Sequence, residues 1–331
     1  MLGFKKTRKN SKFIYYIKVY LKTIIPSCIL RHRLPKILKQ AQNRPDFEYI
    51  KKRVDYYNQL NNNTILPNSV KKASEITRKN FEYQSVYYHD THEFIRYFDI
   101  NNKISIVGND LTIVPDIPSV VKSRPIRQAN IDNTNSVVLK LNKVRHYIFV
   151  DDPYKFQEKD NRVIFRGDIK YKPHRAKFIE MYASHPLCDV CDIAHKSETN
   201  VAKHRKPISI KKHLKFKYIM ALEGNDVSSN LKWIMSSNSI AVMPKSKFET
   251  WFMEGTLIPN YHYIEIKADF SDLIERIEYY NAHPHEAEAI VKHANEYVEQ
   301  FKNKKRERLI SLLVLNKYFE KTGQTYWKEQ K

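Results

Sequence analysis

Arginine, lysine and glycine crowd one short stretch of the sequence, RVIFRGDIKYKPHRAK at residues 162–177. The apolar run VIF is typical of a buried strand that ends at Arg166 and Gly167, and a helix is expected to begin near Arg175. A glycine lets the backbone come close to a ligand, and two guanidinium groups can hold phosphate oxygens by paired hydrogen bonds. The N-terminus of the helix adds amide donors. The stretch is therefore a candidate anion-binding turn, although by itself it favours the alternative, a solvated basic loop.

A second stretch of similar character is ALEGNDVSSNLKW at residues 221–233. A strand is expected to end at Gly224, and a helix that carries Lys232 is expected to follow. Polar residues lie between them, namely Asn225, Asp226, Ser228, Ser229 and Asn230. Such residues at the start of a helix favour anion binding. Ordinary capping of the helix is the alternative, and for the two serines it is the favoured one.

A carboxylate that can act as a general base lies in the stretch VPDIPSVVKSR at residues 114–124. Asp116 stands between Pro115 and Pro118, and the fixed backbone torsion of proline stiffens this turn. A carboxylate held in a cleft can take a proton from a reacting hydroxyl group. The alternative is a plain turn residue, which is a common role of aspartate.

Four potential zinc ligands lie close together in the sequence, at His185, Cys188, Cys191 and His195. A lone pair of cysteines with this spacing is a weak zinc signature, because structural zinc sites need four ligands that converge. We therefore predict no metal site, while the sequence leaves open whether these residues bind anything.

Three large aromatic residues, Trp251, Phe252 and Tyr261, are candidates for contact with a nucleoside or a sugar. Large rings more often fill the core of a domain, because they bury the most apolar surface. We expect core packing for at least two of the three.

The composition restricts the class of protein. The chain has 331 residues, 42% of them hydrophobic, and a formal net charge of +22, which indicates a globular protein with an anionic partner. Nucleic acid, an anionic membrane surface and a phosphorylated small molecule or glycan all fit this charge. Among the six glycines, no pair has the spacing of a dinucleotide fingerprint or a P-loop. Three cysteines do not make a disulfide framework, which favours a reducing compartment.

The first 34 residues combine apolar and basic side chains. Lys18 and Lys22 interrupt the apolar run, so this segment is too charged to span a bilayer. A basic amphipathic segment on a membrane surface and a folded first helix both remain open.

Strands and helices are expected to alternate from about residue 160 onward, which predicts an α/β domain with a mostly parallel sheet. The expected strands after VIF are KYIMALEG (217–224), SIAVM (239–243) and YHYIEIK (261–267). Helices are expected from Ser271, from Pro284 and over residues 304–321. The N-terminal half has a looser pattern, with basic helices up to about residue 60, a helical stretch at 70–98 and short strands in 103–121.

Four motifs, in this order and spacing, resemble glycosyltransferase family 90. They are FRG (165–167), EGNDVSSNLKW (223–233), MPKSKFETWFMEG (243–255) and YHYIEIKADFSDL (261–273). The resemblance covers roughly residues 105–300, and the bacterial lipopolysaccharide branch of the family is the most similar.

This resemblance implies a GT-B architecture, in which two Rossmann-like domains face each other across a cleft. The domains would be residues 1–155 on the acceptor side, residues 156–300 for the nucleotide-sugar, and a last helix at 301–331 that packs back on the N-terminal domain. The donor would be a UDP-sugar, and the reaction would invert the anomeric centre without a metal or other cofactor.

The resemblance also implies roles for single residues. Asp116 matches the family's catalytic base, and Arg166 and Arg175 match the arginines that contact the donor diphosphate. The segment from Asn225 to Asn230 matches the nucleotide site. Several eukaryotic members have an arginine at the position of Asn230, so Lys232 becomes the candidate for the missing positive charge.

We therefore interpret the chain as an inverting glycosyltransferase that moves a hexose or pentose from a UDP-sugar to a lipopolysaccharide core or a related surface glycan. The resemblance implies a cytoplasmic enzyme, with peripheral contact to the inner membrane left open. The alternatives are a basic nucleic-acid-binding protein and a non-catalytic glycan-binding relative. Against the first, the basic residues are spread along the whole chain and form no known binding motif, so we expect no nucleic-acid partner. Against the second, Asp116 is present.

Overall fold

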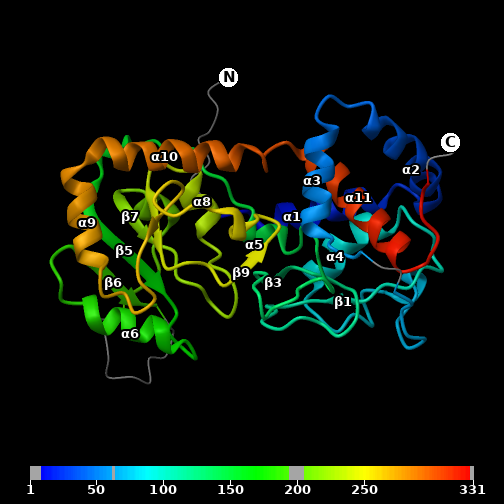
Figure 1. Cartoon of the computed structure of the whole chain (residues 1–331), viewed down its shortest axis with the longest axis horizontal. Coiled ribbons are helices and arrows are strands. Elements are labelled where there is room, and N and C mark those ends of the chain that lie inside the picture. The colour runs from blue at the N-terminus through cyan, green and yellow to red at the C-terminus, as the bar shows by residue number, and fades with distance from the viewer. Residues whose placement is uncertain (1–8, 62–63, 194–204, 329–331) are drawn as a thin grey trace. The chain divides into compact units, whose positions relative to one another are not determined.

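The computed structural model describes residues 9–61, 64–193 and 205–328, and these group into two compact units (Figure 1). The five-strand unit is built on Arg145–Ser246 and Gly255–Gln300. The helix-rich unit is built on Asn10–Val144, Lys247–Glu254 and Phe301–Lys331. Compared with the domain limits expected from the sequence, residues 145–155 and 247–254 group with the opposite unit.

A parallel sheet with the strand order β10-β8-β7-β5-β6 forms the centre of the five-strand unit. Its strands are β5 (Asp160–Gly167), β6 (Cys188–Asp192), β7 (Phe216–Met220), β8 (Ile240–Met243) and β10 (Ile264–Glu265). After β5, the chain adds β6 on one side and then β7, β8 and β10 on the other. This is a doubly wound order, in which the direction of winding reverses between β5 and β7. The predicted α/β class with a mostly parallel sheet is confirmed for this unit.

Two of the predicted strands are shorter than expected. β7 ends at Met220 instead of reaching Gly224, because the carbonyl groups of Leu222 and Glu223 accept hydrogen bonds from a side chain and no longer pair in the sheet. β10 covers two residues of the predicted 261–267, because the chain turns before it, where the Asn260 amide donates to the Tyr263 carbonyl.

Helices cover the sheet of this unit. They are α6 (Pro173–Tyr182), α7 (Ile210–His213), α8 (Leu231–Met235), α9 (Leu273–Ala282) and α10 (Pro284–Glu299), with α5 (Lys143–His146) where the chain enters the unit and the 3-10 turns η2 (Phe156–Glu158) and η3 (Glu254–Thr256). The helices predicted from Ser271 and Pro284 are confirmed as α9 and α10. Right-handed crossovers in opposite directions, β5-α6-β6 and β7-α8-β8, place α6 and α8 on opposite faces of the sheet.

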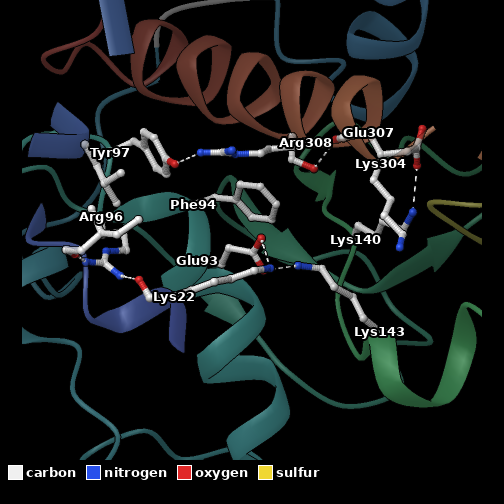
Figure 2. Close-up of a pocket in the computed structure, with 13 residues that line it drawn as sticks. Lys22, Glu93, Phe94, Arg96, Tyr97, Lys140, Lys143, Lys304, Glu307 and Arg308 are labelled. Carbon is white, nitrogen blue, oxygen red and sulfur yellow. Dashed lines mark hydrogen bonds and ion pairs between the residues drawn. The ribbon is translucent and has the colours of Figure 1, made fainter. Parts of the chain in front are cut away.

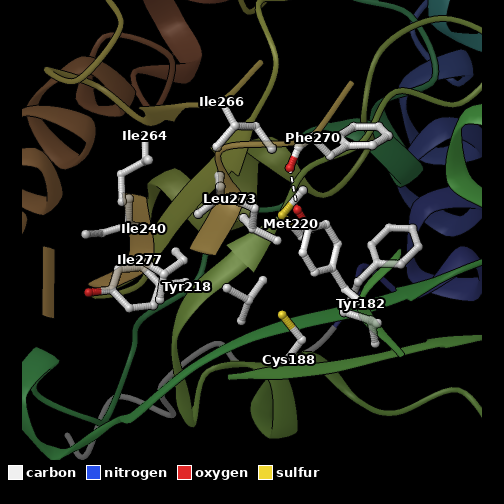
Figure 3. Close-up of a cluster of buried hydrophobic side chains, with 14 of the residues drawn as sticks. Tyr182, Cys188, Tyr218, Met220, Ile240, Ile264, Ile266, Phe270, Leu273 and Ile277 are labelled. Atoms are coloured by element: carbon white, nitrogen blue, oxygen red, sulfur yellow. Dashed lines mark hydrogen bonds between the residues drawn. The ribbon is translucent and has the colours of Figure 1, made fainter. Parts of the chain in front are cut away.

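The core of this unit lies between the sheet and α6, α9 and the start of α10 (Figure 3). Alternate residues of the strands, such as Tyr218 and Met220, face this core because side chains of a strand alternate between its two faces. Tyr182 on α6 reaches across and donates a hydrogen bond to the carbonyl oxygen of Phe270, at 2.5 Å. The continuous apolar runs that predicted these strands follow from burial on both faces.

The helix-rich unit contains α1 (Lys12–Thr23), α2 (Ser27–Gln42), α3 (Phe47–Tyr57), η1 (Ala73–Glu75), α4 (Ser85–Ile95) and α11 (Lys304–Lys321). Its parallel sheet has three short strands, β1 (Ile106–Val107), β2 (Ser119–Val121) and β4 (Ser136–Val138). A separate antiparallel pair joins β3 (Ser123–Pro125) to β9 (Phe248–Thr250). The helix predicted over 70–98 is correct only for 85–95, whereas the helix predicted over 304–321 is confirmed.

Buried aromatic and charged side chains hold this unit together. Trp251 is fully buried, stacks on Tyr57 with ring centroids 3.9 Å apart, and donates from Nε1 to the Glu307 carboxylate at 2.6 Å. Phe252 is also fully buried and packs against Phe301. The expected core packing of at least two of the three large aromatics is thus confirmed. Tyr261, in the five-strand unit, is 42% exposed.

Candidate active site at the carboxyl edge of the sheet

The winding order of the five-strand unit indicates where a ligand would bind. In doubly wound sheets, ligands bind beyond the carboxyl ends of the strands, at the point where the winding reverses. Here that point lies between β5 and β7. The chain that follows β5 leads into α6, and the chain that follows β7 runs through residues 221–230. Both stretches that the sequence singled out therefore lie at this one edge.

Arg175 joins the two stretches across the reversal point. Its Nε donates to the carbonyl oxygen of Glu223 at 2.9 Å, Nη2 to that of Leu222 at 2.8 Å, and Nη1 to that of Asp168 at 3.2 Å. Burial lowers the pKa of the Arg175 guanidinium to about 10, although the charge of Asp168 opposes this shift. Within the described parts of the chain, no carboxylate forms an ion pair with Arg175. Its positive charge is therefore only partly offset, which suits an anionic ligand.

The sequence did not single out His174, which lies beside Arg175 at the start of α6. Its Nε2 is 2.9 Å from the same carbonyl oxygen of Glu223. The adjacency of a histidine and an arginine at the start of a predicted helix was the only available signal, because the carbonyl group that they share belongs to the segment after β7, about fifty residues further along the chain.

Arg166 lies on a face of the sheet and not at its edge. Its Nη2 forms an ion pair with Asp189 Oδ2 at 2.7 Å, and Nη1 donates to the Asp189 carbonyl at 2.5 Å. The side chain is only 5% exposed. Asp189 also pairs with Arg205 at 2.9 Å, so this carboxylate lies between two guanidinium groups. A direct contact between Arg166 and a diphosphate would require Arg166 to leave Asp189, and the predicted role of Arg166 stays a prediction.

The two glycines of the candidate site differ in what surrounds them. A Cβ atom on Gly167 would lie 2.3 Å from the ring of Phe165, so this glycine makes room for a core side chain. A Cβ atom on Gly224 would lie 3.5 Å from Arg175 Nη2, which is ordinary contact. Gly167 is therefore required by packing within β5, and Gly224 lies directly against the Arg175 guanidinium.

The segment that follows Gly224 is hydrogen-bonded to the end of β7. Asn230 donates from its side chain to the Met220 carbonyl at 2.9 Å, and the Ser228 hydroxyl donates to the side chain of Asn230. Asn230 is the N-cap residue of α8 and makes no side-chain capping bond, so the capping role favoured for Ser228 and Ser229 is wrong.

The other residues of this segment differ in exposure. Asn225 is exposed, Ser229 is half-buried and Asp226 is buried. Lys232 is completely buried within α8. A contact between Lys232 and a bound ligand would require its surroundings to move. Of the candidate cations Arg166, Arg175 and Lys232, Arg175 is therefore the one whose guanidinium lies at the reversal point.

Asp116 belongs to the helix-rich unit, in an exposed turn that precedes β2. Asn135 donates to the carbonyl oxygens of Pro115 and Asp116, at 3.1 and 2.9 Å, and Tyr318 donates to that of Pro118 at 3.0 Å. The backbone of the turn is therefore fixed from two sides. The Asp116 carboxylate makes no hydrogen bond or ion pair with any residue that the structure describes. A fixed backbone with an available carboxylate suits a general base.

The two cysteines of the possible zinc motif point away from each other. Both lie on β6, three residues apart, so their side chains lie on opposite faces of the sheet. Cys188 belongs to the core, where burial raises the pKa of its thiol to about 12, and burial also raises that of Cys191. The two thiols do not converge on one ion. His195 lies outside the described residues.

Comparisons with known proteins agree with the resemblance seen in the sequence. The family model described as Glycosyl transferase family 90 matches residues 133–320. The chain is 37% identical over 314 residues to the O-glucosyltransferase LpsA of Dichelobacter nodosus, which covers 94% of this chain and 96% of that protein. It is also 32% identical over 80 residues to the uncharacterized protein 179R of Invertebrate iridescent virus 6, which covers 22% of this chain and 7% of that protein.

Proposed function

This chain belongs to glycosyltransferase family 90, and from this premise we propose that it transfers a hexosyl group from a UDP-sugar to a hydroxyl group of a lipopolysaccharide core or a related surface glycan. The name of its relative from Dichelobacter nodosus favours glucose as the sugar and an oxygen atom as its acceptor.

The observation that carries the donor proposal is the position of Arg175. This half-buried guanidinium lies at the reversal point of the sheet, and its three hydrogen bonds all go to main-chain carbonyl groups. A diphosphate would supply the negative charge that these carbonyl groups lack, and charge-assisted hydrogen bonds are about twice as strong as neutral ones. His174 lies beside it, and its Nε2 contacts the same Glu223 carbonyl group. We assign the donor diphosphate to this edge, with Gly224 and the segment from Asn225 to Asn230 around the nucleotide.

The proposed reaction is a single displacement at the anomeric carbon. The acceptor oxygen bonds to that carbon as the bond to the diphosphate oxygen breaks, and Asp116 takes the proton of the acceptor hydroxyl. Positive charge builds on the sugar ring and negative charge on the departing UDP. Arg175 stabilises the negative charge of the departing diphosphate. Because the acceptor attacks from the side opposite to UDP, the anomeric configuration inverts.

The proposal includes a GT-B arrangement, in which the five-strand unit binds the donor and the helix-rich unit carries the base. The family resemblance supports this assignment, as does the doubly wound sheet of the five-strand unit. In the helix-rich unit the parallel order β1-β2-β4 supports it, with Asp116 directly before the central strand.

We further propose that the enzyme works in the cytoplasm and lies on the inner membrane surface. Half of the large hydrophobic residues that are exposed in the described structure lie on α1, at the start of α2 and in the turn between them, namely Phe13, Ile14, Ile17, Tyr20, Leu21, Ile24, Ile25 and Ile29. Lys12, Lys18 and Lys22 lie among them, and such a mixture favours the interface of an anionic bilayer. In the described residues, no helix by itself has the length and apolarity to cross a bilayer, and α1 and α2 pass that test only as a pair bent by 87°.

The experiment that tests the donor site is thermal unfolding with UDP, GDP, CMP and UDP-sugars, in the presence of a metal chelator. A ligand that binds only the folded state raises the unfolding midpoint by mass action. We expect a UDP-specific increase in the wild type and a loss of roughly tenfold or more in UDP affinity in Arg175→Gln, because a hydrogen bond to a charged group is lost. Lys177→Gln, an exposed change on the same helix, is the matched control.

Two results would contradict this proposal. If Arg175→Gln binds UDP as tightly as the wild type does, the diphosphate lies elsewhere. If no nucleotide raises the midpoint while DNA does, the protein is a nucleic-acid-binding protein instead.

A further inference from the structure

A pocket of 420 Å³ in the helix-rich unit has a strongly basic lining (Figure 2). It is formed by residues from α1, α2, α4, the segment 140–143 and α11. Six cationic side chains line it, namely Lys22, Arg96, Lys140, Lys143, Lys304 and Arg308. Only two acidic side chains do so, Glu93 and Glu307, which leaves a formal excess of 6 − 2 = +4. The volume lies in the range of pockets that bind small molecules.

Both acidic residues of the pocket are already shared between two cations. Glu93 accepts from Lys22 at 2.7 Å and from Lys143 at 3.0 Å. Glu307 accepts from Lys140 at 3.0 Å and from Arg53, which lies outside the lining, at 2.6 Å. The pocket therefore contains no carboxylate that is available to balance its remaining cations.

Three lining cations, Arg96, Lys304 and Arg308, have no acidic partner in the described structure. Arg96 donates to the Ser27 hydroxyl at 3.2 Å and to the Lys22 carbonyl at 3.0 Å, and Arg308 donates to the Tyr97 hydroxyl. Lys304 and Arg308 are exposed and lie one turn apart at the start of α11, an eighteen-residue helix whose N-terminus itself favours an anion. Cations gathered in one pocket repel each other, and a bound anion removes that repulsion.

We propose that this pocket binds a phosphate monoester, and that the phosphate is carried by the acceptor. A monoester dianion carries two negative charges, which offset two of the three lining cations that have no acidic partner. Lys304 and Arg308 can reach it because they are exposed. The pocket has room for more than the phosphate, and its lining includes the ring of Phe94, an apolar surface for the group that carries the phosphate. Ile25 and Leu30 also line it, so the pocket adjoins the apolar face of α1 and α2.

Binding of a phosphate monoester is inferred from the pocket alone, whereas the assignment of this phosphate to the acceptor rests on the proposed function. Two carriers share this chemistry, a phosphorylated saccharide and a lipid with a phosphate monoester headgroup. Glucose 6-phosphate serves as the soluble probe, and phosphatidylcholine vesicles with phosphatidic acid serve as the lipid probe.

The test is a titration of the full chain with glucose 6-phosphate while UDP is kept saturating, so that the donor site is occupied. We expect the wild type to bind glucose 6-phosphate and not to bind unphosphorylated glucose. In Lys304→Gln/Arg308→Gln we expect the affinity for glucose 6-phosphate to fall roughly tenfold or more, because two charge-assisted contacts are lost. The charge-matched control is Lys211→Gln/Lys292→Gln, which changes two exposed lysines of the five-strand unit and is expected to bind as the wild type does. Tyr97→Phe removes the hydrogen bond to Arg308 and keeps the charge, so we expect binding within about threefold of the wild type.

The vesicle arm identifies the carrier. The phosphate is assigned to a lipid if binding to phosphatidic acid vesicles depends on Lys304 and Arg308 and glucose 6-phosphate binds weakly. It is assigned to a saccharide if glucose 6-phosphate binds tightly through these two residues and the vesicles bind weakly. Equal affinity of Lys304→Gln/Arg308→Gln and wild type for both probes, or no binding of either probe by the wild type, overturns the proposal. If UDP fails to bind while the pocket binds the phosphate probe, phosphate binding by the pocket is confirmed, and the assignment of that phosphate to the acceptor is contradicted.

Discussion

At the scale of single residues, burial and partners decide what each arginine does. Arg166 is buried against a carboxylate, Arg175 is half-buried against carbonyl groups, and Arg124 is fully buried with Glu249 at 2.8 Å. A guanidinium that already has a carboxylate gains little from a second anion, whereas one with carbonyl partners gains much. The three residues therefore differ in their capacity to bind a ligand, although they are the same amino acid.

The role of Asp116 is tested by the isosteric change Asp116→Asn. We expect glycosyl transfer to fall by roughly a hundredfold or more, because the amide cannot take the proton of the acceptor hydroxyl. The affinity for UDP and the unfolding midpoint are expected to stay unchanged, because the described structure shows no hydrogen bond or ion pair that the Asp116 carboxylate would lose. Measured transfer at the wild-type rate would remove Asp116 from the base role.

At the scale of elements, the end of β5 is shaped by the contact between Phe165 and Gly167. The ring of Phe165 belongs to the core that joins β5 to α6, and it occupies the space where a side chain at position 167 would lie. The glycine that the sequence suggested for a ligand is therefore needed by the packing of the strand itself.

The change Gly167→Ala tests this packing. The added Cβ atom would lie 2.3 Å from the ring of Phe165, and we expect the free energy of unfolding to fall by about 1–3 kcal/mol. Gly224→Ala is the matched control, since its nearest neighbour is 3.5 Å away, and we expect a change of at most about 0.5 kcal/mol. Urea titrations of both variants measure the difference. Equal stability of the two variants would show that the Phe165 ring moves aside freely.

Glu93 on α4 links α1 to the segment that follows β4, through Lys22 and Lys143. Burial by itself would raise the pKa of Glu93, but the charges of Lys143 and Lys22 lower it to about 2. A carboxyl group with a lowered pKa in the folded state stabilises the fold fully above its unfolded pKa. That stabilisation is lost as the pH falls through the folded pKa.

We therefore expect Glu93→Gln to be less stable than the wild type by roughly 2–4 kcal/mol at pH 6, and the difference to fall by about half at pH 3. Urea titrations at several pH values between these limits measure it. Glu296→Gln, which affects an exposed pair with Lys292, is the control, with an expected effect within about 0.5 kcal/mol at every pH. A difference for Glu93→Gln that does not change with pH would refute the electrostatic explanation.

At the scale of the whole molecule, the net charge of +22 and the exposed apolar face of α1 and α2 favour the same kind of partner. Scattered apolar side chains on a surface need no explanation, but a run of them on consecutive helical turns does. A bilayer that carries anionic lipid satisfies both features, because its interior accepts the apolar side chains and its headgroups attract the lysines.

This partner is tested by sedimentation with vesicles of phosphatidylcholine, with and without phosphatidylglycerol. We expect binding to the anionic vesicles that weakens with salt, and a loss of roughly tenfold or more in Leu21→Gln/Ile24→Gln, whose side chains are 60% and 73% exposed. Ile65→Gln/Ile113→Gln changes two isoleucines elsewhere that are 88% and 71% exposed and is the control. If both double variants bind vesicles alike, the face of α1 and α2 does not contact the membrane.

The sequence by itself determined the order of the buried runs, the parallel α/β class and the family. These follow from local patterns, because the periodicity of apolar residues and the spacing of motifs are visible within a few turns of chain. It therefore predicted β5, β8, α9, α10 and α11, and it placed both candidate stretches at strand ends.

Only the tertiary structure decided which groups meet. Arg175 bonds to carbonyl groups 47 and 48 residues away, Arg308 bonds to Tyr97 at a separation of 211 residues, and Arg53 pairs with Glu307 at 254. Such partners come together because packing joins elements that are distant in the chain, and no local pattern encodes them. The burial of Lys232, the pairing of Arg166 with Asp189 and the basic pocket of the helix-rich unit follow from that packing alone.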